Sequence, residues 1–218
     1  SEYFSGNSNL SGIDTAKAEL QRLGHKLVEV SLPHTQAAVP VYYVLASAEA
    51  STNLSRYDGV RFGHRCNDPQ SLQDLYERSR EEGFGEEVKR RILTGTYTLS
   101  VGYFDAYYLK AQKIRRLISE DFQQAFTKVD VLLAPTSPTP AFKKNQLTDD
   151  HVAMYQQDLY TVPTSLAELP AISLPCGFCD GLPMGMQLIA PAFGEELLLQ
   201  LAAQYQGQTD WHLRRPGD

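Results

Sequence analysis

Apolar residues recur at helical spacing over much of the first 126 residues, and this pattern predicts a series of helices. Asp14 precedes segment 15–23 and Gly24 follows it, which is the order of an N-cap, a short helix and a C-terminal glycine. Ser71 is expected to cap another helix, because Asp74 follows three residues later. The helices expected after the first one cover residues 42–54, 71–80, 86–100 and 103–126.

The last third of the chain changes from helical spacing to short apolar runs bounded by proline and glycine. Strands are expected over residues 129–134, 171–174 and 184–189, with an earlier one over 26–30. A final helix over 195–206 should end at Gly207. Strands that alternate with helices predict an α/β layered fold, in which helices flank a largely buried mixed sheet.

Composition places the chain among globular proteins that do not bind nucleic acid by charge alone. Of its 218 residues, 42% are hydrophobic and 21% are charged, close to the usual globular balance. The formal net charge of −6 gives too weak a basic surface for direct backbone-driven contact with RNA. Apolar runs are too short to span a bilayer, so no membrane association is expected. The polar start without Met indicates a cut end.

The cysteines and histidines do not indicate a metal site. Three cysteines are too few for a disulfide framework, which favours a reducing compartment: the cytoplasm, or an organelle matrix. Cys176 and Cys179 form a C-x-x-C pair, but a structural zinc site needs four ligands and a redox pair normally opens a helix. We therefore expect Cys176 to pack at a strand end and Cys179 to lie in an exposed turn. The five histidines show no ligand spacing.

Two charged residues are predicted to face inward. At about 100° per residue, Arg91 lies about 60° from apolar Val88 on its helix, whereas Arg90 lies about 160° away. Arg91 should therefore border the core and Arg90 should be solvated. A further helix is expected around residues 152–160, and its spacing would put Asp158 on the apolar side.

Two interpretations of these inward charges stay open. In the first, Arg91 and Asp158 pair with each other or with neighbours, because an unpaired buried charge costs several kcal/mol. In the second, the guanidinium grips an α-carboxylate in a bidentate fork and the carboxylate holds an α-ammonium, so that the two select a free amino acid. Segment 135–140 follows the end of a strand, where α/β sheets commonly place ligands.

Five long segments carry a family resemblance. They are residues 49–63 (EASTNLSRYDGVRFG), 82–92 (EGFGEEVKRRI), 103–113, 135–142 and 169–177 (LPAISLPCG). They resemble the family of A subunits of the glutamyl-tRNA(Gln) amidotransferases, within the amidase-signature proteins. The resemblance extends over about residues 12–216 and implies an α/β/α layered amidase-signature fold.

The resemblance implies a function and a set of partners. In that family the subunit hydrolyses glutamine and passes ammonia to a partner of a heterotrimer, which amidates Glu-tRNA(Gln). It implies no cofactor in this chain, with ATP and magnesium at the partner subunit, and tRNA contacted mainly through that partner. Carried over by motif, Arg91 would hold the glutamine α-carboxylate and Asp158 its α-ammonium, while Tyr42 would line the same pocket.

The family's catalytic serine, relay serine and lysine belong to a glycine- and serine-rich segment that does not occur in this sequence. No catalytic residue is therefore expected here, because nucleophile and base must lie within hydrogen-bond reach. We expect residues 1–218 to form a single incomplete domain, the C-terminal part of the subunit, which supplies the substrate-binding half and is inactive alone. The alternatives are a truncated module that binds partner subunits or glutamine, and part of a stand-alone amidase.

One departure from the family concerns the backbone beside the expected pocket. Glu168 stands where the family usually has a glycine. If this position requires a positive φ, a non-glycine residue would be strained by about 1 kcal/mol or more.

Overall fold

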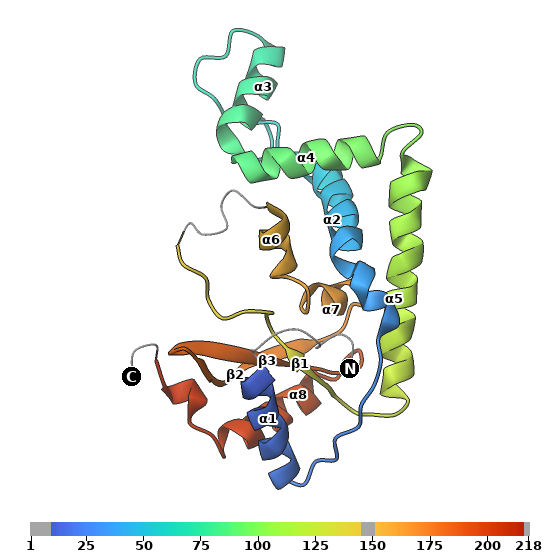
Figure 1. Ribbon diagram of the computed structural model, residues 1–218. Coiled ribbons are helices and arrows are strands. Elements are labelled where there is room, and N and C mark those ends of the chain that lie inside the picture. The colour runs from blue at the N-terminus through green and yellow to red at the C-terminus, as the bar shows by residue number, and fades with distance from the viewer. Residues whose placement is uncertain (1–9, 145–150, 216–218) are drawn as a thin grey trace. The chain divides into compact units, whose positions relative to one another are not determined.

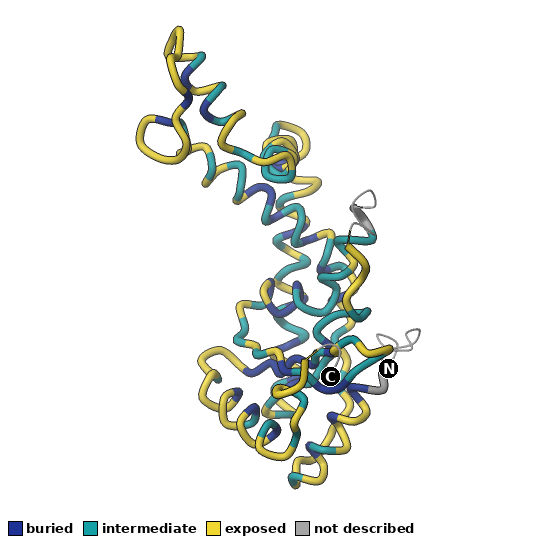
Figure 2. Tube along the Cα trace, turned by 90° about the vertical axis from the view of Figure 1, so that its left-hand side faces the viewer, coloured by how far each residue is buried: buried dark blue, intermediate teal, exposed yellow. Residues whose placement is uncertain are grey.

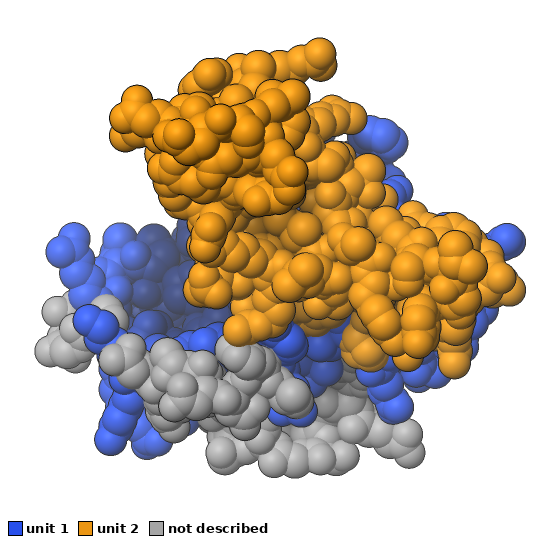
Figure 3. Space-filling view, turned by 90° about the horizontal axis from the view of Figure 1, so that it is seen from above, with its two compact units in different colours: residues 1–39, 115–218 blue, residues 40–114 orange. Residues whose placement is uncertain are grey.

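The computed structural model describes residues 10–144 and 151–215 (Figure 1). The chain divides into two compact units, coloured separately in Figure 3: unit 1 comprises residues 1–39 and 115–218, and unit 2 comprises residues 40–114. The chain enters unit 2 within helix α2 (Ala38–Leu54) and returns to unit 1 within α5 (Lys110–Phe126). That residues 1–218 form one incomplete domain stays a prediction.

Unit 2 is helical in its described residues. Besides most of α2 it contains α3 (Leu72–Gly83), α4 (Glu86–Thr98) and the π-helical turn η3 (Phe104–Leu109). The predicted cap of α3 is confirmed, since the Ser71 hydroxyl accepts a hydrogen bond from the Asp74 amide at 3.1 Å. The helix expected over 103–126 is confirmed, with the difference that its start, η3, is π-helical and the α-helical part begins at Lys110.

Unit 1 is built on a three-stranded sheet with the order β1-β3-β2. The strands are β1 (Leu132–Pro135), β2 (Ala171–Cys179) and β3 (Leu182–Ile189). The α/β class is confirmed. Every strand pair within the described ranges is antiparallel, so the parallel pairs of a mixed sheet stay a prediction.

The turn between β2 and β3 is shorter than expected. Asp180 and Gly181 have φ values of 51° and 77°, as in the two-residue hairpin turns with left-handed residues. Because two residues suffice to reverse the chain, β2 continues to Cys179. Cys176 packs in the interior, as predicted, but lies within β2 and not at a strand end; Cys179 is a half-buried strand residue and not part of an exposed turn.

The core of unit 1 lies between the sheet and the helices α1 (Leu10–Arg22) and α8 (Glu195–Gln206). These two helices lie on one side of the sheet in Figure 1, and Figure 2 marks the buried residues of the chain in dark blue. Successive strand residues point to opposite faces, so alternate residues of β2 and β3 fill this core. The buried cluster comprises Ile13, Ala16, Leu20, Leu174, Cys176, Met184, Met186, Leu188, Ala190, Leu198, Ala202 and Tyr205.

The N-terminal predictions were correct at one end of α1 only. Gly24 has a φ of +92°, and the His25 amide donates to the Leu20 carbonyl at 3.0 Å, which is the expected glycine C-cap. Asp14 lies inside the helix, where it pairs with Lys17, and is not the N-cap. The strand expected over 26–30 is wrong, because in the described structure this segment pairs with no other strand.

The described part of unit 1 also contains short helices. They are η2 (Pro33–Ala37), α6 (His151–Gln156), α7 (Val162–Leu166) and η4 (Trp211–Leu213). The final helix, α8, has the predicted bounds and is followed by Gly207. No helix among the described residues is both long and apolar enough to span a bilayer.

Candidate functional site

Arg91 lies on α4 against an aromatic ring of α2. Its guanidinium carbon is 5.9 Å from the centroid of the Tyr43 ring, and its Nε is 3.3 Å from a Glu87 carboxylate oxygen. The two neighbouring arginines differ less than predicted, since the side chain of Arg91 is 41% exposed and that of Arg90 is 46% exposed. The Nε atom of Arg91 is nevertheless buried, so the stem of this side chain faces inward as expected.

A glycine explains why these two helices come so close. A Cβ atom at Gly95 would lie 1.9 Å from the Ser47 carbonyl oxygen, so only glycine permits this backbone contact. Arg91 precedes Gly95 by four residues, and Tyr43 precedes Ser47 by four residues. Since residues four apart share one helix face, the close contact brings Arg91 and Tyr43 together one turn away.

Tyr42 takes part in the same aromatic arrangement. It is half-buried, and its ring meets the Tyr43 ring edge-on, with centroids 5.1 Å apart and planes at 83°. Two of the three predicted site residues, Tyr42 and Arg91, therefore contact one common ring. Tyr43, which joins them, was not predicted as a site residue, although it is adjacent to Tyr42.

Part of the hydrogen-bonding capacity of the Arg91 guanidinium is unused in the described structure. Its buried Nε has no hydrogen-bond partner among the described residues, since the geometry toward Glu87 is that of an ion pair only. Guanidinium N–H groups form a planar fork that matches a carboxylate. The arrangement is suited to binding an anionic planar group beside two tyrosine rings.

Asp158 belongs to unit 1 and does not lie on a helix, which corrects the prediction of a helix over 152–160. Helix α6 ends at Gln156, and the next amides donate to carbonyls three residues back: that of Asp158 donates to Tyr155 at 3.2 Å. Successive bonds of this kind make tight turns in place of an α-helix. Asp158 is half-buried, and the pairing of its carboxylate with Arg91 or with a ligand stays a prediction.

The turn that carries Asp158 is attached on one side to the segment after β1 and on the other side to strand β3. The Thr139 hydroxyl donates to the Gln157 side-chain oxygen at 2.9 Å, and Gln187 of β3 donates to the Tyr160 carbonyl at 2.7 Å. Gln187 was not among the predicted site residues. The signal was a single polar residue within the otherwise apolar strand segment 184–189.

The strained position expected at Glu168 is confirmed. Its φ is +59°, and the Leu169 amide donates to the Thr164 carbonyl, as in a helix C-terminus that normally ends with glycine. Arg115 of α5 forms an ion pair with the Glu168 carboxylate and donates from Nε to the Leu166 carbonyl at 2.9 Å. The side chain that replaces the glycine therefore has a partner that also caps α7.

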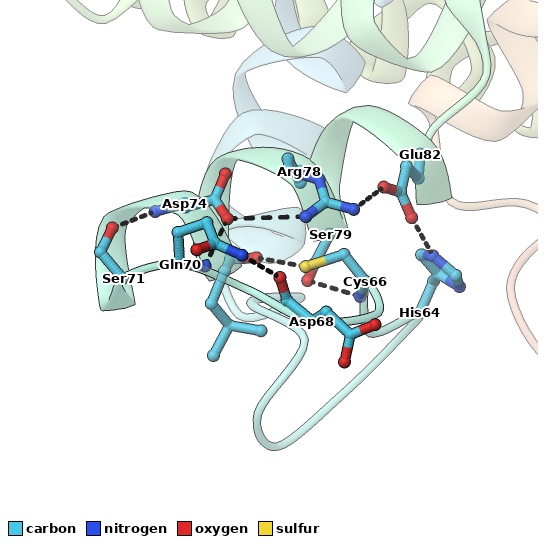
Figure 4. A network of polar contacts seen from close by, with 10 residues as sticks. His64, Cys66, Asp68, Gln70, Ser71, Asp74, Arg78, Ser79 and Glu82 are labelled. Carbon is cyan, nitrogen blue, oxygen red and sulfur yellow. Dashed lines mark hydrogen bonds and ion pairs between the residues drawn. The ribbon is translucent and has the colours of Figure 1, made fainter.

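Unit 2 contains a second polar cluster, formed by residues of α3 and of the loop that precedes it (Figure 4). Arg78 lies 3.5 Å from Asp74 and 3.2 Å from Glu82, and the other Glu82 oxygen lies 2.8 Å from His64 Nε2. The hydrogen bond from His64 lowers the pKa of the Glu82 carboxyl. These side chains are hydrogen-bonded or ion-paired with one another, so the cluster joins the loop before α3 to that helix. No metal-binding group of three or more ligands exists in the described residues.

Unit 1 also contains a cavity of about 660 Å³ beside strand β1. Tyr160 is one of its lining residues, and burial raises the pKa of this tyrosine. Asp158 does not line this cavity. Its walls are formed by residues 29–33, Thr35, Gln36, Phe122, Lys128, 132–134, Tyr160, Pro163 and Ile189.

The family model described as Amidase matches residues 6–199, and the chain belongs to this family. Solved structures agree on the fold. A 6-aminohexanoate cyclic dimer hydrolase, 21% identical, superposes with a TM-score of 0.70 over 95% of this chain and 42% of its own.

The curated relatives define the similarity more narrowly. The chain is 60% identical to the glutamyl-tRNA(Gln) amidotransferase A subunit of Nitrosococcus oceani over 218 residues, 99% of this chain and 45% of that protein. The Pseudomonas fluorescens A subunit is 60% identical over 204 residues, 94% of this chain and 42% of its own length. The crystal structure of the Thermotoga maritima A subunit is 35% identical, with a TM-score of 0.69 over 95% of this chain and 41% of that chain.

The family resemblance seen in the sequence is thereby confirmed. The chain spans less than half the length of the curated relatives that it matches.

Proposed function

We propose that this chain supplies the glutamine-binding part of the amidase subunit of a glutamyl-tRNA(Gln) amidotransferase. In this proposal, Arg91 binds the glutamine α-carboxylate, Asp158 binds the α-ammonium and Tyr42 lines the pocket. The observation that carries it is the Arg91 guanidinium, which is partly exposed, stands on the Tyr43 ring and has an Nε without a hydrogen bond in the described structure. The identity to the relatives named above supports the substrate.

The chemistry in this proposal is an acyl transfer in which this chain binds and orients the substrate. A serine outside this sequence attacks the glutamine side-chain amide, ammonia leaves, and water then hydrolyses the acyl-enzyme. Two charge-assisted contacts to the α-groups would hold the far end of glutamine and so fix the position of its amide. The proposal includes two partner subunits in the cytoplasm, with ATP, magnesium and most tRNA contacts on a partner and no cofactor in this chain.

The proposal is tested with a hybrid subunit. The part of the Nitrosococcus oceani A subunit that this chain does not match is joined to this chain and assembled with the partner subunits of that organism. Ammonia release is measured with glutamine and with two analogues: γ-aminobutyramide, which lacks the α-carboxylate, and glutaramate, which lacks the α-ammonium. A charge-assisted hydrogen bond contributes about 1.5–3 kcal/mol, so each lost contact should lower kcat/KM for glutamine about 10- to 100-fold.

Each substitution has its own diagnostic substrate. Arg91→Ala should lower kcat/KM for glutamine and leave that for γ-aminobutyramide nearly unchanged, whereas Asp158→Ala should leave that for glutaramate unchanged. Arg90→Ala is the matched control, because this arginine is adjacent, more exposed and already paired with Glu87. Unchanged glutamine turnover in both variants would reject glutamine recognition by these residues and favour an amidase for a different amide.

A further inference from the structure

Gln187 occupies an unusual place for a polar residue. It lies in β3, the central strand of the described sheet, opposite Ala134 of β1 and Ser173 of β2, and it is only 3% exposed. Its neighbours Met186 and Leu188 point into the core beneath α1 and α8. Because strand residues alternate, the Gln187 side chain points to the opposite face of the sheet.

Both hydrogens of the Gln187 amide are used on that face. Nε2 donates to the Pro135 carbonyl at 3.0 Å and to the Tyr160 carbonyl at 2.7 Å. Both partners are acceptors, so only the NH₂ group of the amide can satisfy them. One buried side chain thereby joins three segments: the central strand, the end of β1 and the turn after Asp158.

The Asp158 turn is held by local hydrogen bonds and by a side-chain attachment on each side. It is closed by bonds between residues three apart, and the Asp158 carbonyl accepts from the Thr161 amide at 3.2 Å and the Val162 amide at 3.0 Å. On its N-terminal side the Gln157 side chain is bound to Thr139. On its C-terminal side the Tyr160 carbonyl is bound to Gln187. Asp158 stands between these two attachments.

From this geometry we infer that Gln187 is a positioning residue for Asp158, and through it determines how strongly the enzyme selects substrates that carry an α-ammonium group. The inference rests on the proposed role of Asp158 in glutamine binding. Gln187 itself does not touch the substrate; its amide fixes the backbone from which the carboxylate projects. A loosened turn would lose the orientation of that carboxylate and leave the acyl-transfer residues unaffected.

The test uses Gln187→Met in the hybrid subunit, since methionine keeps the length and apolar stem of the side chain but cannot donate the two hydrogen bonds. The expected result is a KM for glutamine raised about tenfold, the effect of one well-oriented contact, with kcat nearly unchanged. The KM for glutaramate, which lacks the ammonium, should stay within about twofold, so the selectivity for glutamine over glutaramate falls about tenfold. Gln200→Met is the matched control, because Gln200 is exposed on α8 and its amide donates to Glu196 of the same helix.

A second measurement does not depend on substrate. Hydrogen exchange followed by mass spectrometry on peptides that cover residues 157–163 should speed up in Gln187→Met, because the Thr161 and Val162 amides lose the fixed turn. Faster exchange together with the fall in selectivity supports the inference. Unchanged exchange overturns it, and so does an equal loss of activity toward glutamine and glutaramate, which would indicate a general structural role.

The two proposals fail in different ways. If Asp158→Ala lowers the selectivity for glutamine over glutaramate and Gln187→Met does not, the inference about Gln187 is overturned while the proposed function stands. If neither variant alters selectivity although exchange at the turn speeds up, Gln187 positions the turn, and the proposed role of Asp158 is wrong.

Discussion

Replacing Gly95 by alanine sets two contributions of opposite sign against each other in unit 2. Alanine is the better helix former by about 1 kcal/mol, so helix propensity alone predicts a more stable α4. The new Cβ, however, would lie 1.9 Å from the Ser47 carbonyl oxygen and 2.9 Å from the Ser51 Cβ. To restore an ordinary contact of 3.4 Å to that oxygen, the helices must separate by about 1.5 Å.

The clash outweighs the propensity. Added methyl groups in a packed contact cost about 1–3 kcal/mol, and the upper end applies here because the contacted atom is backbone and cannot rotate away. Separation of the helices also weakens the contact between Arg91 and Tyr43, which contributes about 0.5–1 kcal/mol. After the gain in propensity is subtracted, the clash alone should lower the free energy of unfolding by about 2 kcal/mol.

Urea denaturation followed by far-ultraviolet circular dichroism measures this effect. With a denaturant slope of about 2 kcal/mol per M, the midpoint should fall by about 1 M. Thr94→Ala is the control, because Thr94 is exposed on the same helix and alanine there should leave the midpoint unchanged or slightly raised. A raised midpoint for Gly95→Ala would refute the close contact between α2 and α4. It would also refute this contact as the reason why the Arg91 guanidinium lies over the Tyr43 ring.

Two further predictions concern a helix cap and the cysteines. Ser71→Ala removes the acceptor of the Asp74 amide and should lower the free energy of unfolding by about 1 kcal/mol in the same urea assay, whereas Ser71→Asp keeps an acceptor and should not. Burial raises the pKa of the Cys176 thiol to about 11, and iodoacetamide reacts with the thiolate. In the native chain at about pH 8, peptide mass spectrometry should therefore find half-buried Cys179 alkylated well before Cys176, and equal rates would contradict the buried position of Cys176.

The candidate site was predictable only where its residues lie on long helices. Helical spacing identified the inward stem of Arg91, because one face of α4 is apolar over several turns. The same reasoning failed for Asp158, which follows a six-residue helix and lies in a turn. Periodicity assumes that the helix continues, and a short segment carries too few residues to show where it stops.

At Glu168 the backbone conformation was predictable from nearby residues, whereas the side-chain partner was not. A helix C-terminus of this kind is closed by hydrogen bonds within six residues, so the positive φ could be expected from a single replaced glycine. Its partner Arg115 lies 53 positions away in the chain and could not be expected. The helix C-cap pattern predicts the positive φ of Glu168, and the packing of α5 places the positive charge of Arg115 beside its carboxylate.

By itself the sequence determined the features whose hydrogen bonds close within a few residues. These are the cap of α3 at Ser71, the glycine end of α1 and the bounds of α8, since each depends on neighbours along the chain. Only the tertiary structure decided which apolar segments pair as strands, and segment 26–30 has the pattern without a neighbouring strand in the described residues. It also decided the partners of Gln187, which are 27 and 52 positions away, because a buried amide takes whichever carbonyls the fold brings to it.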